Sequence, residues 1–81
     1  METFIDEPVR IACLFENGQI KPLVFFWKKR TYKVTGVVFS YSKLVGKDKI
    51  YYFSLQCPQG NFELSFNLQK LNWRLEKTYG E

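Results

Sequence analysis

Residues 23–34 read LVFFWKKRTYKV, and this stretch decides the fold class. The run Leu23–Trp27 is aromatic and β-branched, a composition that is enriched in strands. Lys28–Thr31 forms a short polar break. From Tyr32 onward, apolar Tyr32 and Val34 alternate with polar Lys33 and Thr35. This period of two is typical of a strand. Two such runs with a short break between them predict a β-hairpin.

The residues before this hairpin predict one more strand. Between Pro8 and Glu16, apolar residues recur at every second position from Val9 to Phe15. Asn17–Gly18 is a turn dipeptide that accepts positive φ, so a second strand should follow it, with Pro22 at its beginning. The third strand is expected from Tyr32 to about Tyr41, with a bulge or bend at Gly36.

The C-terminal half continues in the same way. The segment Ser42–Asp48 contains a glycine and two lysines, and a third lysine follows it directly. It is expected to be an exposed, mobile connection before a strand over Lys49–Cys57. Turn residues at 58–61 precede a strand over Phe62–Asn67, one face of which should be wet. The last segment fits either helical or strand spacing. We favour a short turn at Leu68–Lys70 and then a strand around Trp73.

These elements predict a single all-β domain over residues 1–81, without a linker. Five or six short strands joined by tight turns imply an antiparallel meander, either a curled sheet or a small barrel of the SH3-like kind. Aromatic residues make up 19% of the chain and can fill such a core.

The composition argues against an enzyme and against a metal centre. Histidine, the commonest general base and metal ligand, does not occur. Cys13 and Cys57 cannot complete a structural zinc site, and both are expected to be buried thiols. No glycine-rich phosphate loop is present, so we expect no cofactor and no small-molecule substrate.

The sequence predicts a cytoplasmic protein without a membrane segment. Two cysteines are too few for the disulfide framework of a small secreted domain. The longest apolar run, Leu23–Trp27, is far shorter than the roughly 20 residues of a spanning helix. The first residues are acidic and do not resemble a signal peptide.

The positive charge is concentrated in the middle of the chain. Between Lys21 and Lys49 there are eight cations and one anion, whereas the rest of the chain has four cations and seven acids. Cations release counterions on binding phosphates, and aromatic faces accept stacked bases, so this stretch predicts binding of single-stranded nucleic acid. The candidate contacts are Lys28, Lys29, Arg30, Lys33, Tyr32, Tyr51, Lys43, Lys47 and Lys49.

A protein interface is the alternative hypothesis. Leu23–Trp27 has large apolar residues on both faces, and a single small sheet can cover one of them. Lysines near strand ends also protect against edge-to-edge association, which gives the same charges a structural explanation. The chain could therefore bind another protein, or itself as a homodimer, through a strand edge or an aromatic patch.

The spacing of the aromatic residues also carries a family resemblance. The pattern P-x-x-F-x-W-x-x-R-x-Y-x-V covers residues 22–34, followed by YYF at 51–53, G-x-FEL at 60–64 and W-x-L at 73–75. It resembles a small bacterial domain of unknown function, which occurs alone or appended to polymerase-like proteins of DNA damage tolerance. In that family glycine is common where Lys29 stands, and tryptophan where Phe39 or Tyr41 stands. The resemblance implies a β-fold and an association with DNA metabolism, and it names no ligand.

Overall fold

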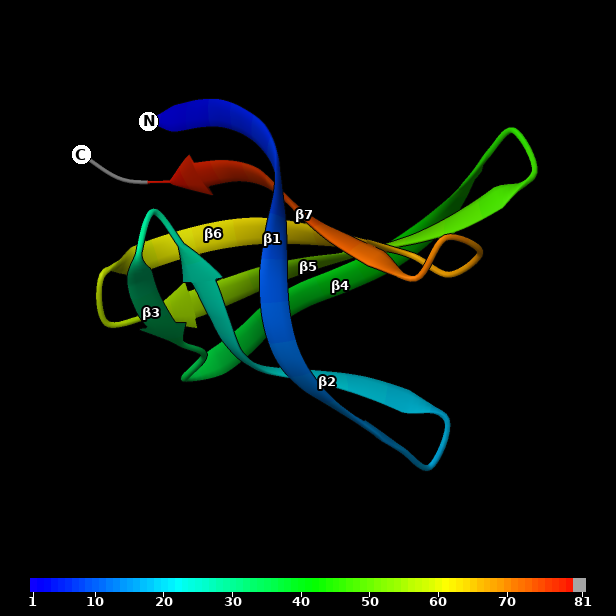
Figure 1. Cartoon of the computed structure of the whole chain (residues 1–81), viewed down its shortest axis with the longest axis horizontal. Coiled ribbons are helices and arrows are strands. Elements are labelled where there is room, and N and C mark those ends of the chain that lie inside the picture. The colour runs from blue at the N-terminus through cyan, green and yellow to red at the C-terminus, as the bar shows by residue number, and fades with distance from the viewer. Residues whose placement is uncertain (80–81) are drawn as a thin grey trace.

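The computed structural model describes residues 1–79 and confirms the all-β class. Residues 1–79 contain no helix long and apolar enough to cross a membrane. Seven strands follow one another along the chain (Figure 1): β1 (Glu2–Glu16), β2 (Gln19–Trp27), β3 (Arg30–Lys33), β4 (Gly36–Val45), β5 (Asp48–Cys57), β6 (Gly60–Asn67) and β7 (Asn72–Tyr79).

The strands form one antiparallel sheet in the order β3-β2-β1-β7-β6-β5-β4. Two meanders, β1 to β3 and β4 to β7, are joined because β1 pairs with both β2 and β7. The first part of β1 lies beside β7, with Val9 opposite Trp73, and its second part lies beside β2, with Arg10 opposite Phe26. The first and last strands of the chain therefore hold the sheet together.

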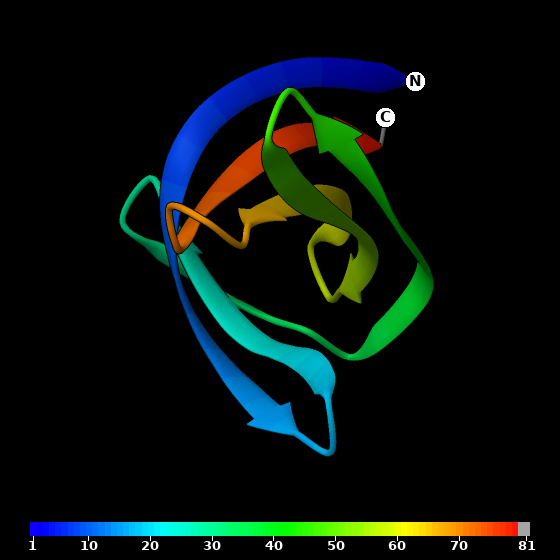
Figure 2. The ribbon, with the colours of Figure 1, turned by 90° about the vertical axis from the view of Figure 1, so that its right-hand side faces the viewer.

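The sheet curls because aromatic rings from its two halves meet. Phe25 of β2 and Tyr32 of β3 stack with their centroids 4.8 Å apart, and their rings lie 5.3 and 5.1 Å from that of Phe62 in β6. Since β1 and β7 lie between β2 and β6 in the sheet, this contact requires strong curvature, and the strands follow a ring in Figure 2. The sheet is not closed, because β3 and β4 are its edges.

The core lies inside the curl. Phe25, Leu55, Leu64 and Leu75 are fully buried. Phe53, Leu55 and Cys57 share one face of β5, and Phe62, Leu64 and Phe66 share one face of β6, in agreement with the alternation of a strand. The other buried hydrophobic residues are Tyr32, Phe53, Cys57, Phe62, Phe66 and Trp73.

The expected third strand is two strands, which raises the number from five or six to seven. The ladder is interrupted at Val34 and Thr35, close to the bend expected at Gly36. The Val34 amide donates to the carbonyl of Leu23 (2.9 Å), and the Thr35 amide donates to the carbonyl of Gln56 (2.8 Å). The chain therefore passes from one edge of the sheet to the other within two residues, which is possible because the sheet curls.

Two other boundaries differ from the prediction. The expected connection at Ser42–Asp48 is mostly strand, because β4 and β5 are joined by the two-residue turn Gly46–Lys47, with Gly46 at φ 64°. The first strand begins at Glu2 rather than Pro8, because the acidic N-terminal residues pair with β7. The turn after Asn67 and the final strand are confirmed.

A bulge in β2 sets which residues face the core. Pro22 lies inside β2 opposite Cys13, whereas Val24 lies opposite Ala12, so Leu23 is an extra residue on this strand. Pro22 was expected at the beginning of the strand, but it lies inside it. Without the bulge the register would place Arg10 opposite Phe25, and a shift of one residue reverses the face of every side chain.

The convex face of β6 was expected to be exposed to solvent, but its central residues are buried. Glu63 and Ser65 are 6% and 4% exposed. The Glu63 carboxylate accepts hydrogen bonds from the hydroxyls of Tyr41 and Tyr79, each at 3.1 Å, and Lys77 Nζ lies 3.4 Å from it. Side chains from β4 and β7 therefore cover the middle of this face.

Phe25 and Phe26 make a matched test of the core. Phe25→Ala should lower the free energy of unfolding by about 3–5 kcal/mol, because it removes a fully buried ring from the contact that curls the sheet. Phe26 is 41% exposed, so Phe26→Ala should cost less than about 1.5 kcal/mol. Urea denaturation followed by circular dichroism measures both losses. Equal losses would contradict the assignment of faces in β2.

Candidate nucleic-acid interface

The lysines and arginines divide sharply into paired and unpaired groups. Four of the 12 form ion pairs within residues 1–79: Lys21 with Glu16, Lys70 with Asp48, Arg74 with Asp6, and Lys77 with Glu2 and Glu63. The other eight form no ion pair with any residue that the structure describes. Positive charge available to an external anion therefore comes from these eight.

The eight cations form two groups. The hairpin cluster consists of Arg10 on β1 and four residues of the β2–β3 hairpin, Lys28, Lys29, Arg30 and Lys33. The tip cluster consists of Lys43, Lys47 and Lys49 around the β4–β5 turn.

The two clusters lie at opposite ends of the molecule. The Gln59 side chain, in the β5–β6 turn, donates to the carbonyl of Thr31 in β3 (3.1 Å), so the β2–β3 hairpin lies near the end of β5. Lys49, at the start of β5, is instead hydrogen-bonded to the β6–β7 loop: its carbonyl accepts from the Leu68 amide, and its amide donates to the Gln69 side chain. Figure 1 shows the β2–β3 and β4–β5 turns far apart along the longest axis. The nine predicted contacts therefore do not converge on one surface.

Of the two predicted stacking tyrosines, one is buried and the other is partly buried. Tyr32 is 5% exposed and stacks on Phe25 in the core, which excludes it as a platform for a base. Tyr51 is partly buried against the core, and Lys49 Nζ lies 5.4 Å from its ring centroid. Both rings contribute mainly to the packing of the core.

The β2–β3 turn has an unusual composition for its geometry. Trp27 is opposite Arg30, and the two residues between them, Lys28 and Lys29, have φ of 53° and 62°. A two-residue turn with both φ positive is normally occupied by Asn-Gly, the pair that stands in the β1–β2 turn at residues 17–18. Lysine is costlier at such positions because its Cβ crowds the backbone. The turn thus holds two lysines despite a local conformational cost.

Sequence reasoning missed Arg10 and Phe26. The two are opposite each other on β1 and β2, and the Arg10 guanidinium lies 5.9 Å from the centroid of the Phe26 ring, which is 41% exposed. They line a hollow of about 500 Å³ with Trp27 and Lys28. Glu7 also lines it, and its carboxylate accepts a hydrogen bond from Trp27 Nε1 (2.9 Å). Their adjacency depends on the Leu23 bulge, so counting from the Asn17–Gly18 turn would not find it.

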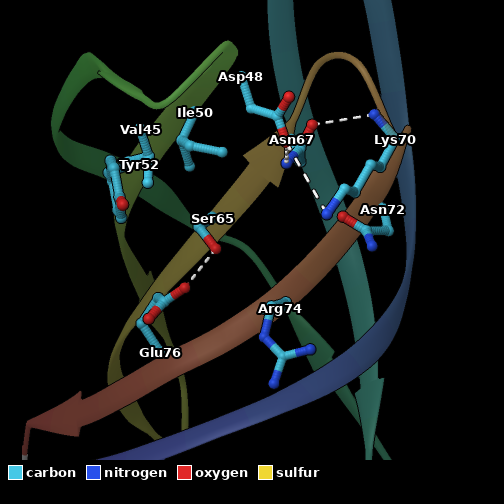
Figure 3. Close-up of a pocket in the computed structure, with 10 residues that line it drawn as sticks. All are labelled: Val45, Asp48, Ile50, Tyr52, Ser65, Asn67, Lys70, Asn72, Arg74 and Glu76. Atoms are coloured by element: carbon cyan, nitrogen blue, oxygen red, sulfur yellow. Dashed lines mark hydrogen bonds and ion pairs between the residues drawn. The ribbon is translucent and has the colours of Figure 1, made fainter.

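A polar groove of about 330 Å³ on the convex face is a weaker candidate. Ser65 and Glu76 point toward each other across β6 and β7 and are hydrogen-bonded, and the Asn67 amide donates to Asp48 (3.0 Å) (Figure 3). The side-chain oxygen Oδ1 of Asn67 accepts from the backbone amides of Gln69 and Lys70. Within residues 1–79 no three acidic or cysteine residues gather where they could hold a metal ion. The polar groups of this groove mainly satisfy one another.

Burial raises the pKa of two tyrosines and two cysteines. Desolvation raises the pKa of the Tyr41 and Tyr52 phenols, and nearby glutamates add to the effect. Desolvation also raises the pKa of both thiols; Cys57 is buried as expected, whereas Cys13 is only half-buried. All four groups therefore keep their protons at neutral pH.

Comparisons with known proteins provide no relative. No family model, no curated protein and no solved structure matches the chain. The resemblance to the small bacterial domain stays a prediction.

The turn geometry predicts a stabilising substitution. Lys28→Asn with Lys29→Gly should raise the free energy of unfolding by about 1 kcal/mol, because both residues tolerate positive φ. Lys28→Gln with Lys29→Gln is the matched control, since it removes the same charges without relieving the backbone. Thermal denaturation compares the two, and an equal gain in both would attribute the effect to charge rather than to turn conformation.

Proposed function

We propose that the protein binds single-stranded nucleic acid through the hairpin cluster. The observation that carries this proposal is that five cations without an ion-pair partner in residues 1–79 lie on the β2–β3 hairpin and on the part of β1 beside it. A phosphate backbone supplies the matching anions, and binding gains free energy as condensed counterions are released.

Phe26 supplies the second element of such a site. Its ring is partly exposed beside Arg10 and borders the hollow next to Lys28. A base stacked on an exposed ring contributes about 1–3 kcal/mol, and every base has a face to stack. Cations flanking an open aromatic ring therefore favour a single strand with little sequence preference.

The cost of the Lys28–Lys29 turn supports the same function. Backbone strain that a cheaper dipeptide would relieve is commonly found at functional sites. The tip cluster is less suitable because its neighbouring rings are less accessible: Tyr52 stacks on Tyr41, with centroids 4.9 Å apart, and Tyr51 packs against the core.

Oligonucleotide titration tests the proposal. Anisotropy of a fluorescein-labelled oligo(dT) should report binding at 50 mM NaCl that weakens steeply at 200 mM. In both double variants of the Lys28–Lys29 turn the affinity should fall, and the slope of log K against log salt should decrease by about 1.4, since each single-strand phosphate contact contributes about 0.7. The Asn-Gly variant should lose affinity although it is the more stable protein.

Lys43→Gln with Lys47→Gln is the control for location, because it removes two cations without ion-pair partners in residues 1–79 from the opposite end. This variant should keep most of the affinity. Equal weakening by both pairs would indicate general attraction to a positive protein, and no binding at 50 mM NaCl would reject the function itself.

Phe26→Ala tests stacking separately from charge. We expect oligo(dT) affinity to fall by roughly five-fold to 150-fold, equivalent to about 1–3 kcal/mol, with an unchanged salt slope. Leu23→Ala shortens a comparably exposed apolar side chain on the same strand, at 49% exposure, and should have little effect. Unchanged affinity in Phe26→Ala would remove this ring from the site.

A further inference from the structure

The two edges of the sheet are protected very differently. The β3 edge has four residues, of which Arg30 and Lys33 are charged. The β4 edge has ten residues, nine of them exposed, and Lys43 is its single charged side chain. Short, charged edge strands resist pairing with another chain, whereas long apolar ones invite it. Six large hydrophobic side chains are exposed along β4, namely Val37, Val38, Phe39, Tyr41, Leu44 and Val45.

A bulge divides β4 into an irregular start and a regular segment. Val37 is opposite Leu55 and Phe39 is opposite Ser54, so Val38 is the extra residue. From Phe39 to Val45 each residue has its own partner on β5 without interruption. This seven-residue segment has its unpaired side facing outward and forms the free pairing edge, with Ser42 at its centre.

The free pairing edge is complementary to itself. In an antiparallel pair of copies related by a two-fold axis at Ser42, Phe39 lies opposite Val45, and Lys43 lies opposite Tyr41 of the other copy. Such pairs join apolar with apolar and a cation with an aromatic ring, and both stabilise cross-strand contacts. On the other face Ser40 lies opposite Leu44, and the two copies of Ser42 meet at the axis. No like charges face each other in this register.

Neighbouring registers that keep the same faces together are less favourable. An axis at Tyr41 would pair Leu44 and Val45 with the irregular residues before Phe39, and an axis at Lys43 would place two lysines opposite each other. A two-fold axis perpendicular to the sheet must pass through a residue rather than between two, because opposite side chains point to the same face. Ser42 is the position that pairs the whole regular segment.

We propose that a second copy of this chain pairs with β4, in antiparallel orientation and with Ser42 at the two-fold axis. The two seven-stranded sheets then form one continuous sheet. The contact is a strand edge of about 24 Å, at about 3.4 Å per residue, so a weak dimer with a micromolar dissociation constant is expected. The dimer uses neither Phe26 nor the β2–β3 turn, and it is independent of nucleic-acid binding.

Charges placed at the axis test this proposal. Sedimentation equilibrium of the wild-type chain from 10 µM to 1 mM should show a monomer–dimer equilibrium that persists in 500 mM NaCl, where oligonucleotide binding is lost. Ser42→Lys and Ser42→Glu, studied at 100 mM NaCl, should each raise the dissociation constant at least ten-fold, because each puts two like charges opposite one another. An equimolar mixture of the two variants should dimerise at least as well as wild type.

Ser40→Lys is the matched control, since Ser40 is exposed on the same strand and lies opposite Leu44 rather than opposite itself. It should weaken the dimer less than Ser42→Lys, and Ser40→Lys mixed with Ser40→Glu should show no charge-dependent rescue. A strictly monomeric wild-type chain at 1 mM would overturn the proposal. So would a dimer that is unaffected by charges at Ser42, or a mixture that is no better than its components.

Discussion

The contact among the Phe25, Tyr32 and Phe62 rings is the interaction on which the rest of the structure depends. It joins β2 and β3 to β6 across two intervening strands, and so converts a seven-stranded sheet into a curl with an interior. A flat sheet of this length would leave one apolar face in water, which an 81-residue chain cannot cover with other elements. The aromatic-rich run at 23–27 is therefore primarily a device for folding.

The curl of the sheet also determines where the two clusters of cations lie. It carries the β2–β3 hairpin to the end of the molecule where β5 finishes, while the β4–β5 turn projects from the other end. The basic middle of the chain is thereby divided into the hairpin cluster and the tip cluster. Between them the surface is occupied by paired charges and satisfied polar groups such as Glu63 and Lys77. The cations without ion-pair partners in residues 1–79 are consequently localised at two ends of the molecule instead of spread over the sheet.

Local patterns predicted the class, several strands and the buried face of β5 and β6, because alternation with a fixed period maps directly onto the two faces of a strand. The features that define the candidate site depend on register, which a local pattern does not specify. Leu23 is an extra residue, and it alone places Phe26 opposite Arg10 and Phe25 in the core. Likewise, Glu63 looked solvated in the alternation, and its burial follows from Tyr41 and Tyr79, which come from other strands.

A titration of isotopically labelled protein with oligo(dT), followed by amide chemical shifts, tests the central claim most directly. The largest shifts should fall on Arg10, Phe26 and residues 28–33, while Lys43, Lys47 and Lys49 change little. Shifts that are spread equally over both clusters, or confined to the β4–β5 turn, would contradict the claim that the curl creates one localised binding end.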